Sequence, residues 1–236
     1  MNRSMLSYIL KWKLCLTLLC CLSAVVAAQE RLSYGFVSPN TREDLKLHKA
    51  IKEMGSPEES KLIEAANNLR CVVRTRIYIY RAVGSWSDGA EHSLLLRVRV
   101  GEPTMRYLLS QLGRDTQQKA VLYFHPQPEG DASIYRLRFD RSLQLSEVAD
   151  ILDQAGIAFR TLVPGKSRTT VYVVDPKREL KEKVLLAARR LQARLFTQRG
   201  KAEFIGTDTR AAAKNVYDSE ISNYEKSHPN LPPRCN

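Results

Sequence analysis

The chain has 236 residues, of which 26% are charged, 44% hydrophobic and 8% aromatic. These proportions are typical of a globular protein and exclude collagen, a coiled coil and a disordered chain. The 37 Lys and Arg residues outnumber the 25 Asp and Glu residues, so the net charge is +12. Such a charge bears on partners and solubility but indicates no fold.

Residues 1–28 have the pattern of a cleaved secretory signal. Arg3, Lys11 and Lys13 form a basic start without an acid, and residues 14–28 are apolar or small and end in Val-Ala-Ala. Small residues at this point suit signal peptidase. The apolar run is shorter than the roughly 20 residues of a spanning helix, which makes a retained membrane anchor the weaker alternative. We expect a periplasmic or secreted protein with no transmembrane span in the mature chain.

Removal of the signal leaves 208 of the 236 residues and, with three basic residues gone, lowers the net charge from +12 to +9. Two cysteines remain, Cys71 and Cys235. In an oxidising compartment they allow one disulfide, and the alternative is a buried Cys71 with an unpaired thiol in the tail. The mature chain has no Asn-x-Ser/Thr sequon, which favours a bacterial envelope over a eukaryotic secretory route.

Two short helices are predicted at the start of the mature chain. Thr41 and Asp44 resemble a capping box ahead of an apolar stripe that ends at Gly55. Ser56 and Pro57 then suit the N-cap and first position of a second helix, which extends to about residue 69.

From residue 71 the hydrophobic period changes from 3.6 to 2, which predicts strands. We expect a hairpin of strands 71–80 and 94–100 about a turn at 84–89, because Asp-Gly favours tight turns. Further strands are predicted at 119–124, 133–139, 157–163 and 169–174. Helices are predicted at 103–112, at 145–155 with Ser146 as cap, at 177–198 and at 209–226.

These elements predict an α+β fold: a mixed sheet of about six strands, in which hairpins link two βαβ units and helices pack mainly on one face. The single domain covers residues 29–205, with a helical part at 29–70, and residues 206–236 form a C-terminal helix and an extended tail. The order of elements at 143–192 resembles a split βαβ module, which indicates fold and not function. No residue-level repeat supports a duplication.

One side of the predicted sheet combines guanidinium groups with phenol rings. Its members are Arg74, Arg76, Tyr78, Tyr80, Arg97, Arg99, Arg136 and Arg138. Such side chains pair with phosphates or carboxylates and stack on planar groups, so the face suits an extended anionic ligand. The alternatives are a solvated face whose arginines pair with nearby acids, and a docking face for a protein partner or a second copy.

Acid–base chemistry is concentrated in the predicted hairpin connection, where Asp88, Glu91 and His92 follow one another. Together with His125 they are candidates for a hydrolase site, and the alternative is turn chemistry with solvated side chains. The chain has no nucleophile elbow, His-Glu-x-x-His, Cys-x-x-Cys or phosphate-binding loop motif. Two histidines and few acids do not suit zinc, so we expect no metal and no cofactor.

The leading hypothesis is therefore an exported, non-enzymatic accessory protein that engages an anionic polymer, an envelope surface or a protein partner through the Arg/Tyr face. A structural subunit of an envelope assembly and a hydrolase that uses the four-residue cluster are the competing hypotheses. The basic residues between 177 and 201 could touch an anionic surface, although such runs are commonly solvated.

Overall fold

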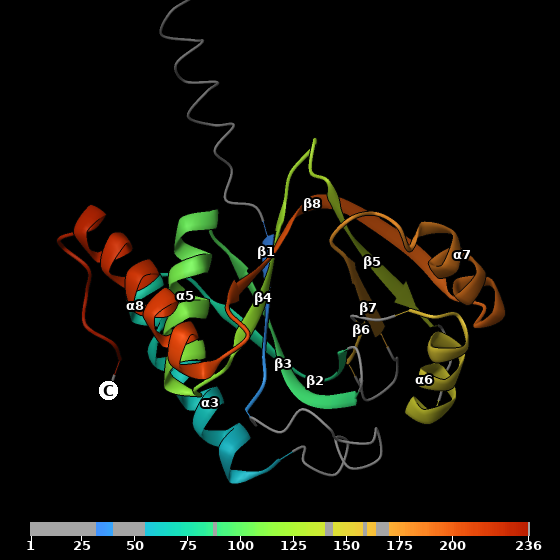
Figure 1. Cartoon of the computed structure of the whole chain (residues 1–236), viewed down its shortest axis with the longest axis horizontal. Helices are drawn as coiled ribbons and strands as arrows, with labels where there is room; N and C mark the ends of the chain where they lie inside the picture. Colours follow the sequence, from blue (N-terminus) through green and yellow to red (C-terminus); the bar gives the residue numbers. More distant parts are fainter. Residues whose placement is uncertain are drawn as a thin grey trace, which may run out of the picture. The chain divides into compact units, whose positions relative to one another are not determined.

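Two similar successions of strands and helices follow one another in this computed structural model, which describes residues 32–39, 55–86, 89–139, 144–157, 160–163 and 170–235 (Figure 1). The first half contains β1 (Leu32–Val37), α3 (Pro57–Asn68), α4 (Arg70–Val73), β2 (Ile77–Trp86), β3 (Gly89–Arg99), α5 (Glu102–Asp115) and β4 (Ala120–Pro126). The second half contains β5 (Ala132–Arg138), α6 (Leu145–Gln154), β6 (Arg160–Val163), β7 (Thr170–Asp175), α7 (Lys181–Arg190) and β8 (Arg194–Gly206). A last helix, α8 (Arg210–Ser227), follows.

The strands form one sheet in the order β1-β3-β2-β6-β7-β5-β8-β4, and β4 pairs with β1 again, so the sheet is closed. Each half contributes its strands in the same order, β4-β1-β3-β2 and β8-β5-β7-β6. Two seams join the halves, one between β2 and β6 and the other between β4 and β8. The element order and strand order thus repeat, although the sequence shows no repeat.

The α+β class is correct, but the expected mixed sheet of about six strands is wrong. The closed sheet has more strands, and every pairing is antiparallel. A βαβ unit places its two parallel strands in one sheet, and they were expected to be neighbours. Helix α5 does connect β3 to β4, but β1 lies between these two strands and is antiparallel to both. In the second half β5 separates β7 from β8 in the same way.

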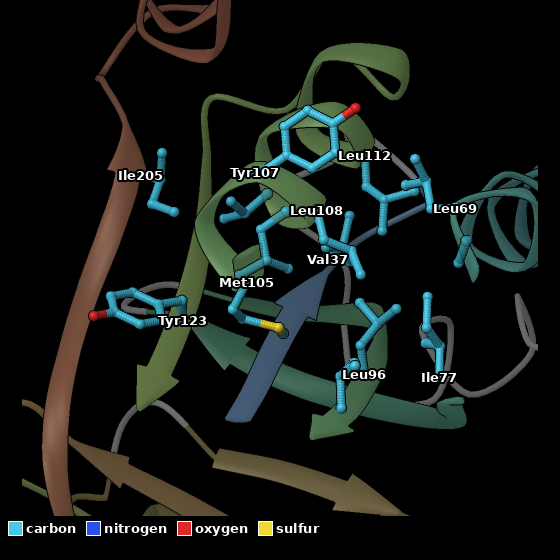
Figure 2. Close-up of a cluster of buried hydrophobic side chains, with 14 of the residues drawn as sticks. Val37, Leu69, Ile77, Leu96, Met105, Tyr107, Leu108, Leu112, Tyr123 and Ile205 are labelled. Atoms are coloured by element: carbon cyan, nitrogen blue, oxygen red, sulfur yellow. The ribbon is translucent and has the colours of Figure 1, made fainter. Parts of the chain in front are cut away.

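Helices cover the outer face of the closed sheet in two groups. Over the first half, α3, α5 and α8 pack on outward side chains such as Val37, Leu96 and Tyr123. Figure 2 shows Met105, Leu108 and Leu112 of α5 within this cluster. Over the second half, α6 and α7 pack on Tyr135, Leu137, Val171 and Val173.

A third cluster contains strand residues and no helix residues, and it fills part of the inner face. Its buried members are Tyr34, Phe36, Leu95, Leu122, Phe124, Ala132, Ile134, Tyr172 and Val174. These residues alternate along their strands with the outward residues of the other two clusters, as the two-residue period of a strand requires. The same strands therefore present helix-covered side chains outward and a mixture of aromatic and aliphatic side chains inward.

Several helices form where the sequence predicts them. The Ser56 hydroxyl oxygen accepts the Glu59 amide at 3.2 Å and caps α3. Thr209 caps α8 in the same way, accepting the Ala212 amide at 3.3 Å. The predicted stripe of α8, which includes Tyr217 and Ile221, is buried against α5, so α8 contributes to the first half's core. The helix expected at 41–54 lies outside the described residues.

The strand expected from residue 71 is wrong at its start. Residues 70–73 form α4, and Arg74 ends this helix with a left-handed φ of 52°. Val72 is buried in the helical cluster, and Cys71 forms a disulfide with Cys235, their Cα atoms 5.4 Å apart. These tertiary contacts outweigh the local alternation. The strand begins only at Ile77, and the hairpin strands extend through much of the expected turn, since Trp86 pairs with Gly89.

The helix expected at 177–198 is wrong in its second part. It ends at Arg190, Gln192 takes a left-handed φ of 51°, and β8 begins at Arg194. Leu195 then joins the apolar cluster beneath α7 from a strand, which satisfies the same burial that a helix would have provided. Thirteen residues long, β8 pairs with both β4 and β5 and spans the two halves.

Two smaller expectations also differ at helix ends. α5 does not stop near Gly113 but extends to Asp115, and a Cβ atom at Gly113 would lie 2.7 Å from the Tyr217 ring. This glycine permits close packing of α8 on α5. In α6 the N-cap is Gln144 and not Ser146.

Candidate functional site

An arginine stands between aromatic side chains on three adjacent strands of the first half. Arg97 of β3 is paired with Tyr34 of β1 on one side and with Tyr78 of β2 on the other. Residues directly opposite in antiparallel strands share a face, so all three side chains point inward. The Arg97 Cζ atom lies 5.3 Å from the Tyr78 ring centroid and 5.5 Å from that of Tyr80, within the range of a cation–π contact.

The second half repeats this arrangement with different residues. Arg136 of β5 is paired with Tyr172 of β7 and with Phe196 of β8. Its Cζ atom lies 4.6 Å from the Phe196 ring centroid. Each half therefore carries one inward arginine flanked by aromatic residues of the two neighbouring strands.

The two groups meet inside the closed sheet. The rings of Tyr34 and Tyr172 have their centroids 6.1 Å apart, although β1 and β7 are not neighbouring strands. The contact therefore crosses the interior. Tyr34 also meets the Phe124 ring edge-on at 6.2 Å, which packs it against β4.

Burial raises the pKa of Tyr34 above its ordinary value, and the neighbouring Tyr172 raises it further. Arg97 and Arg136 both act in the opposite direction but do not outweigh burial. The phenol is thus protonated at neutral pH and available as a hydrogen-bond donor. Because Tyr34 senses both arginines, the cationic groups of the two halves share one electrostatic environment.

The inward arginines differ from those on the outside in their partners. The Nε atoms of Arg97 and Arg136 are buried, and neither makes a hydrogen bond. Within the described residues no carboxylate forms a salt bridge with either side chain. Outside, Arg106 contacts Glu203 at 2.8 Å and Glu220 at 2.6 Å.

The strand residues of the predicted Arg/Tyr face do lie on the same side of the sheet, but this side is not an open surface. Tyr78, Tyr80, Arg97, Arg99, Arg136 and Arg138 occupy inward positions on their strands. They line the inside of a closed sheet, whereas an open wall was expected. Arg74 and Arg76 precede β2 and are exposed, and only Arg76 reaches the group, 4.9 Å above the Tyr78 ring. We use "inner Arg/Tyr site" below for Tyr34, Tyr78, Tyr80, Arg97, Arg136, Tyr172 and Phe196.

The predicted acid–base cluster does not assemble around the two histidines. Ser38, just beyond β1, donates its hydroxyl to the His92 carbonyl at 2.6 Å, and Ser33 near the start of β1 lies 2.7 Å from His125 Nδ1. Five residues of extended chain separate these serines, roughly 16 Å. His92 and His125 thus lie at opposite ends of β1. Asp88 and the Glu91 side chain lie outside the described residues.

His92 instead belongs to a buried ionic group that sequence reasoning missed. Its Nε2 lies 2.7 Å from Glu59 Oε2, and both side chains are fully buried. The same carboxylate accepts the Gly55 amide at 2.9 Å and a hydrogen bond from Arg81 Nε. This group joins α3 to β2 and β3. The sequence carries one signal for it: Glu59 occupies the N3 position after a serine cap, where a carboxylate turns back toward the chain before the helix.

A polar pocket of about 550 Å³ lies where the C-terminal tail meets α5 and α8. Its arginines have partners: Arg114 donates to Gln111 at 2.7 Å, and Arg234 donates to Asp115 at 3.1 Å. Because its charges are compensated, the pocket gives less reason to expect a charged ligand than the inner Arg/Tyr site does.

Neither a metal site nor a membrane span is evident in the described ranges. No group of three His, Cys, Asp or Glu residues there could hold a metal ion. Among the same residues, no helix combines the length and the apolar character needed to cross a membrane. Comparison with known proteins adds no assignment: no family model matches the chain, and no curated protein is significantly similar to it.

Proposed function

We propose that this is an exported, non-enzymatic binding protein, and that the inner Arg/Tyr site holds an anionic group of a polymer or a protein partner. The observation that carries the proposal is the pair of inward arginines with buried, unpartnered Nε atoms and no acidic partner among the described residues. Both side chains are partly exposed, but a buried guanidinium N–H is normally paired, so this site has hydrogen-bonding capacity that the described protein does not use.

The chemistry of the site favours a carboxylate, phosphate or sulfate. A guanidinium group presents donors in a planar fork that matches such anions, and its hydrogen bonds to them are stronger than neutral ones. An aromatic ring covers one face of each arginine, and the Tyr78 and Phe196 rings are themselves exposed, so the donors lie close to solvent. The protonated Tyr34 hydroxyl adds a donor that carries no charge.

The separation of His92 and His125 favours binding over hydrolysis, because a hydrolase built on the predicted cluster requires them in one cleft. The periplasmic or secreted location rests on the leader pattern of residues 1–28 alone.

Binding to heparin, single-stranded DNA and a purified anionic envelope polymer, measured over a salt series, tests the proposal. The variant R97Q/R136Q removes the two arginine charges of the inner Arg/Tyr site. Its matched control, R189Q/R190Q, removes two exposed charges from the last turn of α7. We expect the inner variant to lower affinity for at least one polymer tenfold or more and the control to lower it less than threefold.

Equal losses in the two variants would show that only net charge matters and would overturn the proposal. The absence of binding to all three polymers at low salt would also count against it. A stable oligomer of the isolated chain in light scattering, with the inner arginines insensitive to every polymer, would favour the structural-subunit hypothesis instead.

A further inference from the structure

We infer that the inner Arg/Tyr site takes a ligand with two separate anionic groups, one held by each half of the closed sheet. This inference rests on the proposed function and specifies the ligand class. It follows from the arginines forming two positions, each with its own aromatic support, that lie on either side of a shared pair of tyrosines.

The two positions belong to different halves. Arg97 stands on β3 and lies over rings of β2, whereas Arg136 stands on β5 and lies over a ring of β8. A guanidinium group placed against a ring has one face covered and keeps its in-plane donors for a ligand. Each position can therefore hold one anionic group without the other.

Among the described residues, phenol rings connect the two positions. Tyr34 faces Arg97 across one strand pair, Tyr172 faces Arg136 across another, and the two rings meet at 6.1 Å. A ligand that extends from one arginine to the other passes this apolar ring surface. Its middle part is thus expected to be uncharged, with the anionic groups at its ends.

Like charges also favour a ligand that satisfies both positions. The two guanidinium groups both act on the Tyr34 hydroxyl, and within the described residues neither has a carboxylate partner. A monoanion neutralises one position and leaves the other cationic. A dianion neutralises both, and its second contact forms at a high effective concentration once the first is made.

A dianion that contacts both arginines would also connect the two halves of the sheet. Without it, the halves are joined by two seams of different length. The β4–β8 seam runs from Ala120 to Pro126, while among the described residues the β2–β6 seam pairs Val83, Gly84 and Ser85 of β2 with β6. A dianion should therefore raise the thermal stability of the whole sheet by linkage, by an amount that grows with the logarithm of its concentration relative to its Kd.

The test is isothermal titration calorimetry of the mature chain with linear dicarboxylates, from malonate to suberate, and with monocarboxylates of the same lengths at constant ionic strength. We expect one range of lengths at which the dicarboxylate binds at least tenfold more tightly than its monocarboxylate. In that range R97Q and R136Q should each reduce dicarboxylate affinity to the monocarboxylate level, while R189Q/R190Q leaves it within threefold.

The outcomes separate this inference from the proposed function. If mono- and dicarboxylates bind equally at every length and both lose affinity in R97Q/R136Q, the site holds one anionic group, and only the inference fails. If no carboxylate binds and the polymers also fail to bind, both fail. The length dependence is measured on the unmodified protein, so it decides the inference even where an arginine variant does not fold.

Discussion

The outer and inner faces of the closed sheet differ in whether their cationic side chains have acidic partners. On the outside, apolar side chains are sealed by helices, and the cations near them have acidic partners, as Arg106 has Glu203 and Glu220 and Lys201 has Glu102. On the inside, Arg97 and Arg136 rest on aromatic rings, and their buried Nε atoms are unpartnered. The charges of the outer face are therefore compensated within the protein, whereas the inner face carries the site that we propose to bind an anion.

The largest expected effect concerns the outer layer, which is closed covalently. The Cys71–Cys235 bond joins α4 to the C-terminal tail, 164 residues apart in sequence. Replacing both cysteines with serine should lower the free energy of unfolding by about 3 kcal/mol, because the unfolded chain regains conformational freedom. Urea unfolding measures the change.

The same variant tests whether the disulfide on the helical side affects anion binding on the inner face. The disulfide lies on the helical side, so the folded C71S/C235S protein should keep its anion affinity within threefold. Wild-type protein under reducing conditions should unfold at the same urea concentration as the variant. If the variant folds but loses anion affinity tenfold, the two faces are coupled and the division drawn above is wrong.

A middle-sized effect compares one arginine from each face. Arg106→Met leaves Glu203 and Glu220 without their shared partner and should lower the free energy of unfolding by about 1–2 kcal/mol. Arg97→Met loses cation–π contacts but removes an unpartnered charge, and Met packs well against rings, so the change should stay within about 0.5 kcal/mol. Urea unfolding at pH 7 measures both. An Arg97→Met loss as large as that of Arg106→Met would make the inner arginine a structural residue.

Elements with one dominant apolar stripe could be predicted from the sequence. The stripe of α8 is buried as its period predicts, and the same holds for Leu108 and Leu112 of α5. The failure at β8 has a physical reason: its outward and inward positions carry Arg, Lys, Gln and Glu as well as apolar residues, so no two-residue period is visible. Its strand character depends on backbone pairing with β4 and β5.

For the site, the sequence predicts which face of the sheet a side chain occupies, but not which strands come together. Alternation placed Arg97, Arg136, Tyr78 and Tyr80 on the face opposite the helices, where the structure has them, but it did not identify Tyr34 and Tyr172. Closure of the sheet depends on pairs such as Val83 with Leu162, which belong to different halves and leave no local signal. For the same reason the Tyr34–Tyr172 contact and the Glu59–His92 pair could not be inferred from spacing.

The smallest expected effect is an acid-dependent contribution on the outer face. Burial alone would raise the pKa of Glu102, but Lys201, which donates at 2.9 Å, acts together with Tyr123 and Arg106 to hold the pKa below the ordinary value of 4.5. A carboxyl whose pKa is lower in the folded state stabilises the protein above pH 4.5, and this stabilisation is lost as the pH falls through the folded pKa. Glu102→Gln should therefore lower the free energy of unfolding by about 0.5 kcal/mol at pH 7, since the pair is partly exposed.

The difference between Glu102→Gln and wild type should vanish once the pH is well below the folded pKa of Glu102, and urea unfolding at several pH values measures it. Lys201→Met provides a matched control, because it should show the same loss at pH 7 and the same disappearance in acid. Salt should reduce the effect of both variants, as it does for exposed ion pairs. A difference that persists unchanged in acid would mean that Glu102 acts through packing, and the charge pairing assigned to the outer face would then not extend to this residue.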